Sequence, residues 1–241
     1  MNGHPAGELV LGRDEVAFLT AHLDRVCRWD SRAVARIRVR GSSLGVFTAP
    51  PTGCLAFVAV PLAAPPPEVP GATQIRALGT WPGEDADPWD RVVPALRLRE
   101  SLAHARGPGS QAHVPVPATD GMYSALAMLP PWDGWQPPVT GVARDVLPLV
   151  QRAVDEFRRD SAGLDAGAQT ALAERIWDRS VWGGLPVRVL HTARLLGLVA
   201  DEPARIAAST CGSWKRLSTR RGQVFHHRDG AHARLSLSVV R

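Results

Sequence analysis

Two stretches decide the fold of the C-terminal part of the chain: GLPVRVLHTARLLGLV, Gly184 to Val199, and WKRLSTRRGQVFHHRDG, Trp214 to Gly230. In the first, apolar residues recur every three or four positions, as they do on one face of a helix. Pro186 suits the first turn of such a helix and Gly197 suits its end. The second stretch alternates short apolar runs with turn residues. The sequence therefore predicts a helix over about 186–196, followed by strands.

Working outward, the same periodicity predicts two earlier helices. One begins near Val142 and ends near Asp160, and Pro148 inside it is expected to bend it. The next covers about Ala168 to Ser180. Four strands are predicted after the third helix, at about residues 205–210, 214–219, 223–227 and 233–240.

The first sixty residues predict a helix followed by an antiparallel meander. With Asp14 as its cap, apolar spacing predicts a helix that ends near Trp29. AVARIRVR, residues 33–40, alternates apolar side chains with arginines, which is typical of a half-exposed strand. LGVFTA (44–49) and CLAFVAV (54–60), each bounded by turn residues, complete a three-stranded sheet that packs on the helix.

Proline then breaks the pattern. PLAAPPPEVPG, residues 61–71, lacks too many N–H groups to continue a sheet, so it indicates a stiff connector. TQIRAL (73–78) is typical of a strand, and DADPWDRVVPALRLRESLAHAR (85–106) predicts a helix that opens with an Asp cap and Pro88. We therefore expect an α+β fold, with a first domain over residues 1–138 and a second over 139–241.

The positive charge lies at the C-terminal end. The chain of 241 residues is 45% apolar and 21% charged, which is ordinary for a globular protein. Residues 205–241 hold eight Lys or Arg and one Asp, a net charge of +7. Because the whole chain carries +5, residues 1–204 carry −2. An anionic partner is therefore expected to contact the C-terminal part.

Compartment signals favour the cytoplasm. No apolar run approaches the roughly 18 residues that a membrane helix needs, and the first residues lack the basic start and apolar core of a signal peptide. Cys27, Cys54 and Cys211 are far apart and show no paired spacing, so a disulfide framework is not expected.

Three helices followed by a β-hairpin is the element order of a winged helix, which the C-terminal domain resembles in arrangement. In that family the third helix lies in the major groove of DNA and the hairpin touches the backbone. Cations and a hydroxyl on the outer arc of the third helix, and cations around the hairpin turn, have the chemistry that binds phosphates and base edges. Seven residues are predicted to bind nucleic acid: Arg188, Thr192, Arg194, Lys215, Arg216, Arg220 and Arg221.

A protein interaction or scaffold role is the alternative. Leu195 lies inside the polar arc of the third helix, where an exposed leucine suits a protein contact. PPWDGWQPP frames Trp132 and Trp135 between proline pairs, so this segment either presents aromatic rings to a partner or forms a rigid strap over the core. A third hypothesis is an enzyme acting on a small anionic substrate between the two halves.

The motifs of known catalytic and metal sites do not support enzyme chemistry. GSSLG contains Ser43 in a nucleophile pattern, but strand-like residues on both sides predict a hairpin instead. The HRD triplet that ends at Asp229 lacks the other kinase motifs, and Asp-Gly there predicts a tight turn. Cys211, His226, His227 and His232 lack the paired spacing of zinc ligands. No catalytic residue, metal or cofactor is therefore predicted.

Three segments carry a resemblance to a family: LPPWDGWQ, IWDRSVWGGLPVRVLHTARLLGLV and GSWKRLSTRRGQVF. Together they are similar to segments of an uncharacterised family of actinobacterial proteins, over about the C-terminal half of the chain. The resemblance implies a GC-rich bacterial, cytoplasmic setting, and it implies no particular activity.

Overall fold

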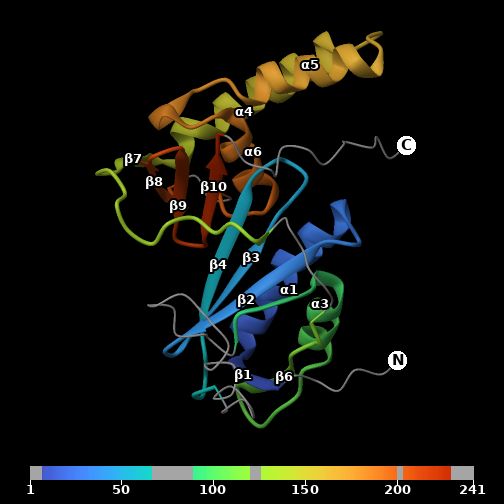
Figure 1. Cartoon of the computed structure of the whole chain (residues 1–241), viewed down its shortest axis with the longest axis vertical. Helices are drawn as coiled ribbons and strands as arrows, with labels where there is room; N and C mark the ends of the chain where they lie inside the picture. Colours follow the sequence, from blue (N-terminus) through green and yellow to red (C-terminus); the bar gives the residue numbers. More distant parts are fainter. Residues whose placement is uncertain (1–6, 67–88, 120–125, 200–202, 229–241) are drawn as a thin grey trace, which may run out of the picture. The chain divides into compact units, whose positions relative to one another are not determined.

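In a computed structural model, the chain divides into two compact units (Figure 1). Unit 1 comprises residues 1–49 and 57–128, and unit 2 comprises residues 50–56 and 129–241. The structure describes residues 7–66, 89–119, 126–199 and 203–228. The strands predicted at 73–78 and 233–240, and the start of the helix predicted from residue 85, lie outside the described residues.

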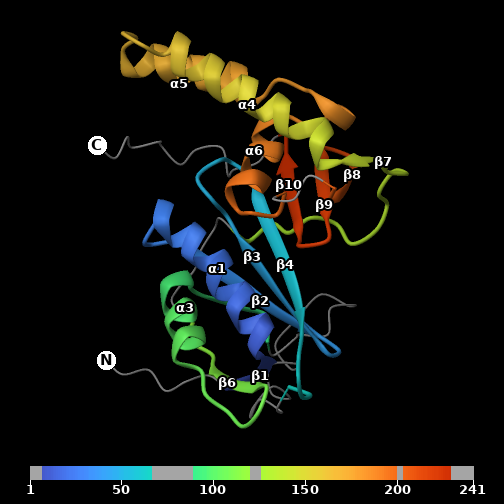
Figure 2. The same ribbon diagram turned by 180° about the vertical axis from the view of Figure 1, so that it is seen from behind.

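The first helix of unit 1 is confirmed. Helix α1 (Arg13–Trp29) buries Leu19, Leu23 and Val26 on one face, as the spacing predicted. Its cap differs from the prediction, because the N-cap residue is Gly12 and Asp14 lies in the first turn. A carboxylate in the first turn still stabilises a helix by interacting with its dipole. Figure 2 shows α1 lying across the sheet of this unit.

The predicted meander is confirmed and is extended by one strand. The sheet of unit 1 contains, in spatial order, β5 (Arg91–Pro94), β2 (Val34–Arg40), β3 (Ser43–Thr48) and β4 (Leu55–Pro61). Alternate residues of β2 are buried, with Ala35 and Ile37 fully inaccessible. The pairing of Arg40 with Ser43 places Ser43 at a hairpin, so the strand-like flanks predicted for this serine are confirmed.

The helix predicted over 85–106 is only partly present. The structure has strand β5 over Arg91–Pro94 and then helix α3 over Ala95–His104, with Pro94 as its N-cap. Val92 and Val93 are β-branched residues, which favour a strand, and their pairing with β2 decides the conformation. Two further strands that were not predicted, β1 (Glu8–Gly12) and β6 (Gln111–Pro115), pair antiparallel.

The arginine face of β2 is less exposed than its alternation predicted. Arg36 Nε lies 2.6 Å from Asp90 Oδ1, and Arg38 Nε lies 3.1 Å from Asp90 Oδ2. All three side chains retain at most 22% of their accessible surface. Arg36 also donates a hydrogen bond to the carbonyl oxygen of Leu126. One carboxylate therefore neutralises two arginines that project from a single face of β2.

The three helices of unit 2 agree with the prediction. They are α4 (Ala143–Asp160), which contains Pro148, α5 (Ala166–Trp177) and α6 (Val187–Leu195). Pro186 is the N-cap of α6, and Gly197 follows the helix with a φ of 70°, which a residue without a β-carbon adopts easily. Both ends of the third helix are therefore confirmed.

The strands of unit 2 form one antiparallel sheet rather than an isolated hairpin. Its spatial order is β10 (Gln223–His227), β9 (Trp214–Thr219), β8 (Arg205–Cys211) and β7 (Val139–Val142). The hairpin predicted as a wing is β9 and β10 of this sheet, and β7 was not predicted. Ile206, Leu217 and Val224 are buried on its inner face. No helix within the described residues is long and apolar enough to cross a membrane.

Candidate nucleic-acid interface

Arg188 faces the protein rather than solvent. Its Nε lies 2.6 Å from Asp178 Oδ1, and its Nη1 donates a 2.9 Å hydrogen bond to the carbonyl oxygen of Thr52. Gly53 has a φ of +72°, and a β-carbon there would lie 2.8 Å from Arg188 Nη1. The guanidinium group is therefore occupied in holding the Pro50–Ala56 segment of unit 2 against α6, which corrects its predicted outward position.

Thr192 is also part of this internal contact. Its side chain is fully buried, and its Oγ1 lies 2.7 Å from both Thr52 Oγ1 and the carbonyl oxygen of Arg188. A hydroxyl donates one hydrogen bond, so the two partners are satisfied when Thr192 donates to the carbonyl and accepts from Thr52. Thr192 therefore has no surface that a phosphate could contact, and its predicted outward position is also corrected.

Replacing Arg188 by Ala is expected to destabilise unit 2. The change removes the hydrogen bond to Thr52, the ion pair with Asp178 and the packing of the arginine stem, so the free energy of unfolding should fall by about 2 kcal/mol. Urea unfolding followed by tryptophan fluorescence would measure this. Arg152→Ala, on the exposed side of α4, is the matched control and should change stability little. Equal effects of the two changes would contradict the role assigned to Arg188.

The two cations at the middle of the predicted wing are engaged in the protein. Lys215 Nζ donates a hydrogen bond to the carbonyl oxygen of Gly184, and burial lowers the pKa of Lys215. The guanidinium carbon of Arg216 lies 4.1 Å from the centre of the Trp135 ring, a cation–π geometry. Burial also lowers the pKa of Arg216. Both side chains therefore have less surface to offer an external anion than their sequence position implied.

Trp135 belongs to a strap over the outer face of the sheet. The segment before β7 runs past β9 and β10 toward β7 (Figure 1). Trp135 packs 5.9 Å from Phe225 between ring centres, and its indole N–H donates to the carbonyl oxygen of Pro131. The backbone N–H of Gln136 donates to the carbonyl oxygen of Thr210. By contrast, Trp132 is 58% exposed. The two tryptophans predicted as partner contacts therefore have different environments.

The remaining predicted residues are on the surface of unit 2. Arg194 is exposed and donates a hydrogen bond to Gln151 Oε1, while Leu195 beside it is 37% exposed. Arg220 and Arg221 are exposed at the turn between β9 and β10. Arg221 Nη1 donates to the carbonyl oxygen of Gly197, so the turn reaches the end of α6. Of the seven predicted nucleic-acid contacts, these three arginines are the ones with exposed side chains.

His226 and His227 each contact a neighbouring group of the chain. His227 Nε2 lies 2.6 Å from Ser213 Oγ, and His226 Nδ1 lies 3.3 Å from the carbonyl oxygen of Gly53. Burial lowers the pKa of His226. Within the described ranges, no group of three or more His, Cys, Asp or Glu residues is arranged to hold a metal ion. His232, one of the four residues weighed as zinc ligands, lies outside those ranges.

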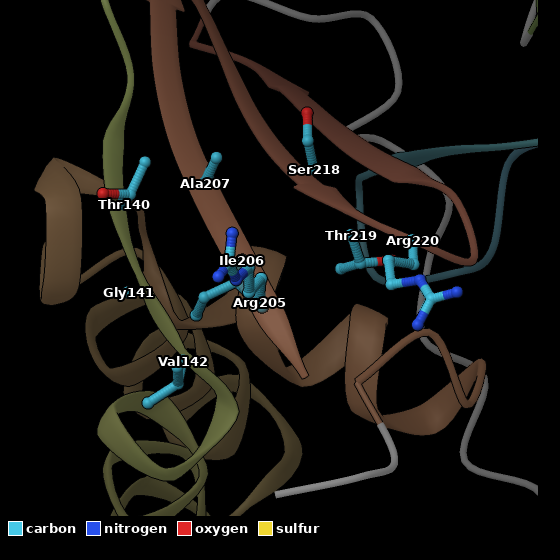
Figure 3. A pocket seen from close by; sticks show the side chains of 9 residues that line it. All are labelled: Thr140, Gly141, Val142, Arg205, Ile206, Ala207, Ser218, Thr219 and Arg220. Carbon is cyan, nitrogen blue, oxygen red and sulfur yellow. The ribbon is translucent and has the colours of Figure 1, made fainter. Parts of the chain in front are cut away.

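A groove crosses the outer face of the sheet beside the predicted turn. Its volume is about 490 Å³, and Figure 3 shows its lining. Ala207 lies in register between Thr140 on β7 and Ser218 on β9, so a small methyl group separates two hydroxyl-bearing residues. The lining residues are Thr140, Gly141, Val142, Arg205, Ile206, Ala207, Ser218, Thr219 and Arg220.

The groove is positively charged. Arg205 and Arg220 are exposed, and neither side chain forms a hydrogen bond or ion pair with another residue in the described part of the chain. Of the nine lining residues, which are all described, none is acidic. Of the groove residues, Arg220 was predicted from the sequence, whereas Arg205, Thr140 and Ser218 were not. The alternation of Arg205, Ala207 and Ser209 along β8 was the signal for Arg205, because alternate residues share a face.

The comparisons match the chain to two families whose function is unknown. Residues 5–124 match a domain of unknown function, DUF8010, and residues 130–231 match a second domain of unknown function, DUF8185. The chain passes from unit 1 to unit 2 at residue 129, between these two matches. No curated protein matches the chain.

Solved structures of sliding clamps share the fold. The DNA polymerase III subunit beta from Pseudomonas aeruginosa is 10% identical, with a TM-score of 0.51 over 91% of this chain and 64% of that chain. The pol III beta of Caulobacter crescentus is 12% identical, with a TM-score of 0.51 over 93% of this chain and 66% of that chain. The chain thus spans less than two thirds of their length. The likeness supports the α+β class, and the winged-helix arrangement stays a prediction.

Proposed function

We propose that the chain is a non-enzymatic regulatory protein that binds nucleic acid through unit 2. The observation that carries the proposal is the groove whose lining includes both Arg205 and Arg220, next to Arg221 at the β9–β10 turn. Exposed arginines with hydroxyl groups between them are the side chains that proteins use to contact phosphates. The fold likeness to proteins named as DNA polymerase sliding clamps supports the choice of a nucleic acid as the anion.

The proposal uses a smaller set of cations than the sequence predicted. Arg188 and Thr192 contribute to the stability of unit 2, and Lys215 and Arg216 are bound to groups of their own chain. The contact surface is therefore the groove and the adjacent turn, together with Arg194 at the end of α6. A surface of this size meets few phosphates, so we expect weak binding that weakens further with salt, with a slope of log K against log salt of about −0.9 for each phosphate contacted.

Binding should respond to the turn arginines in a defined way. In a fluorescence anisotropy titration of a labelled duplex, Arg220→Gln combined with Arg221→Gln should weaken binding about tenfold at low salt. The slope of log K against log salt should decrease by about 2, one for each arginine that no longer neutralises a phosphate.

Arg152→Gln, an exposed arginine on α4 outside the groove, removes the same type of charge and serves as the control. If the wild-type chain does not bind duplex at low salt, or if the control variant weakens binding as much as the turn variant, the proposed function is wrong.

A protein interaction is the second candidate, and the exposure of two apolar residues favours it. Trp132 is 58% exposed and Leu195 is 37% exposed, so each presents apolar surface that a partner could cover. A partner that co-purifies with the wild-type chain and is absent from a Trp132→Ser, Leu195→Ser variant would favour this candidate. Retention of the partner by that variant would rule out the surface.

A further inference from the structure

The groove differs from the rest of the sheet's outer face because the strap does not cover it. Toward β10 the strap lies on the sheet, where Trp135 contacts both Phe225 and Arg216. Toward β7 the same face is open, and its floor is made of Thr140, Ala207 and Ser218 in one cross-strand row. The open end of the sheet therefore presents short side chains and backbone, a shape that can admit a compact group.

The hydroxyl groups of Thr140 and Ser218 can donate hydrogen bonds from two sides of the groove to a compact group that lies in it. Neighbouring strands lie about 4.8 Å apart, and β8 lies between the strands of Thr140 and Ser218. The backbones of these two residues are therefore about 10 Å apart. The methyl side chain of Ala207 leaves the space between the two hydroxyls unfilled. Arg205 is two residues from Ala207 on the same strand and on the same face, about 7 Å away. Figure 3 shows these side chains on β7, β8 and β9.

We propose that this groove is a subsite for a backbone phosphate, and that binding there is independent of base sequence. The proposal rests on the proposed function, because it identifies which part of a nucleic acid the groove takes. Arg205 and Arg220 supply the charge, and the hydroxyls of Thr140 and Ser218 supply neutral donors, which is the mixture that proteins use for phosphate oxygens.

The lining also explains why bases are not read. Direct readout that distinguishes bases strongly uses amide or carboxylate side chains, or arginines aligned with guanine, and binding of unstacked bases uses aromatic rings. The single hydroxyl of Ser or Thr contacts different bases alike. The nine lining residues, all of them in the described part of the chain, include no Asn, Gln, Asp, Glu or aromatic residue. The two arginines are the side chains that could pair with guanine, so the sequence dependence of binding tests this point.

The alternative occupant of such a groove is an acidic peptide lying along the sheet. It would present carboxylates to the same arginines and hydroxyls, in a geometry close to that of the two non-bridging oxygens of a phosphodiester. Phosphate is the occupant that follows from the proposed function, because the fold likeness to DNA polymerase sliding clamps favours a nucleic acid. Competition with a polyglutamate peptide tests this choice.

The first test uses inorganic tripolyphosphate and the full chain. In amide-detected NMR, the backbone amides of Thr140, Ala207 and Ser218 should shift and saturate during the titration. Arg205→Gln should weaken this binding about tenfold, since it removes a charge-assisted hydrogen bond. Arg152→Gln should leave it unchanged. Arg205 is exposed, so this change should not affect folding, and an unchanged urea midpoint verifies that.

The second test separates the groove from the proposed function. If duplex DNA binds to the wild-type chain but does not shift the groove amides, the phosphate subsite is wrong and the proposed function remains. If tripolyphosphate occupies the groove but no nucleic acid binds, the proposed function is wrong and the anion site remains. If a polyglutamate peptide with the same charge as tripolyphosphate occupies the groove equally well, the choice of phosphate is overturned. A difference above about fivefold between G-rich and A/T duplexes overturns sequence independence.

Discussion

Replacing Asp90 by Ala is expected to lower the free energy of unfolding of unit 1 by about 3 kcal/mol. The carboxylate of Asp90 is shared by Arg36 and Arg38, with N–O distances of 2.6 Å and 3.1 Å. The Asp90 side chain is 19% exposed, so water screens these ion pairs little. Without this carboxylate, the largely buried guanidinium groups of Arg36 and Arg38 lie next to each other on one face of β2. Their mutual repulsion then adds to the loss of both ion pairs.

Urea unfolding monitored by circular dichroism would measure this change. Glu100→Ala removes an exposed carboxylate that pairs with Arg97 at 3.1 Å and should change stability by less than about 1 kcal/mol. Asp90→Asn keeps the size of the side chain and removes its charge. If Asp90→Asn is as stable as the wild type, the charge of Asp90 does not stabilise unit 1 through Arg36 and Arg38, and this explanation is wrong.

Stability is expected to fall as the pH decreases from about 6.5 to 4, because His22 is buried as a neutral group. Burial, with a smaller contribution from the charge on Arg25, lowers the pKa of His22 from 6.5 to about 4. His22 of the unfolded chain therefore binds a proton below about pH 6.5, whereas His22 of the folded chain binds one only near pH 4. The full stabilisation is present above pH 6.5, and about 3 kcal/mol of it is lost by pH 4.

His191 of unit 2 acts in the same direction. Burial, and next the charge on Arg194, lower its pKa to about 4, and its ring stacks on Trp177 at 4.7 Å between ring centres. Urea unfolding at several values between pH 7.5 and pH 4 would measure both effects. His22→Gln should remove the part of the pH dependence that belongs to unit 1, because glutamine does not titrate in this range. An unchanged pH dependence in that variant would contradict the assignment.

Elements with strong local patterns could be predicted from the sequence. Helix α1 and strand β2 follow because their apolar residues recur with periods near 3.6 and 2. Both ends of α6 follow because Pro186 and Gly197 have backbone preferences of their own. Strand β5 could not be predicted in this way, because the pairing with β2 decides its conformation, and that partner is more than fifty residues away.

The candidate site was harder to predict, because burial of a charged residue depends on segments distant in sequence. Periodicity placed Arg188 and Thr192 on the polar arc of α6, but the Pro50–Ala56 segment contacts these two residues. The alternation of β8 contained the signal for Arg205. Its partners in the groove, Thr140 and Ser218, became neighbours only through the pairing of β7 with β8 and of β8 with β9.

The assignment of residues 50–56 to unit 2 has a consequence for protein engineering. A single cut near residue 129 leaves the later fragment without Thr52, the residue that Arg188 and Thr192 hold. That fragment would leave Arg188 without the carbonyl oxygen of Thr52 and would uncover the buried Thr192, so it should be less stable than unit 2 in the full chain, although its boundaries follow the family match closely. Supplying the missing heptapeptide in trans, or grafting it by circular permutation, is the way to obtain the second half of the protein in isolation.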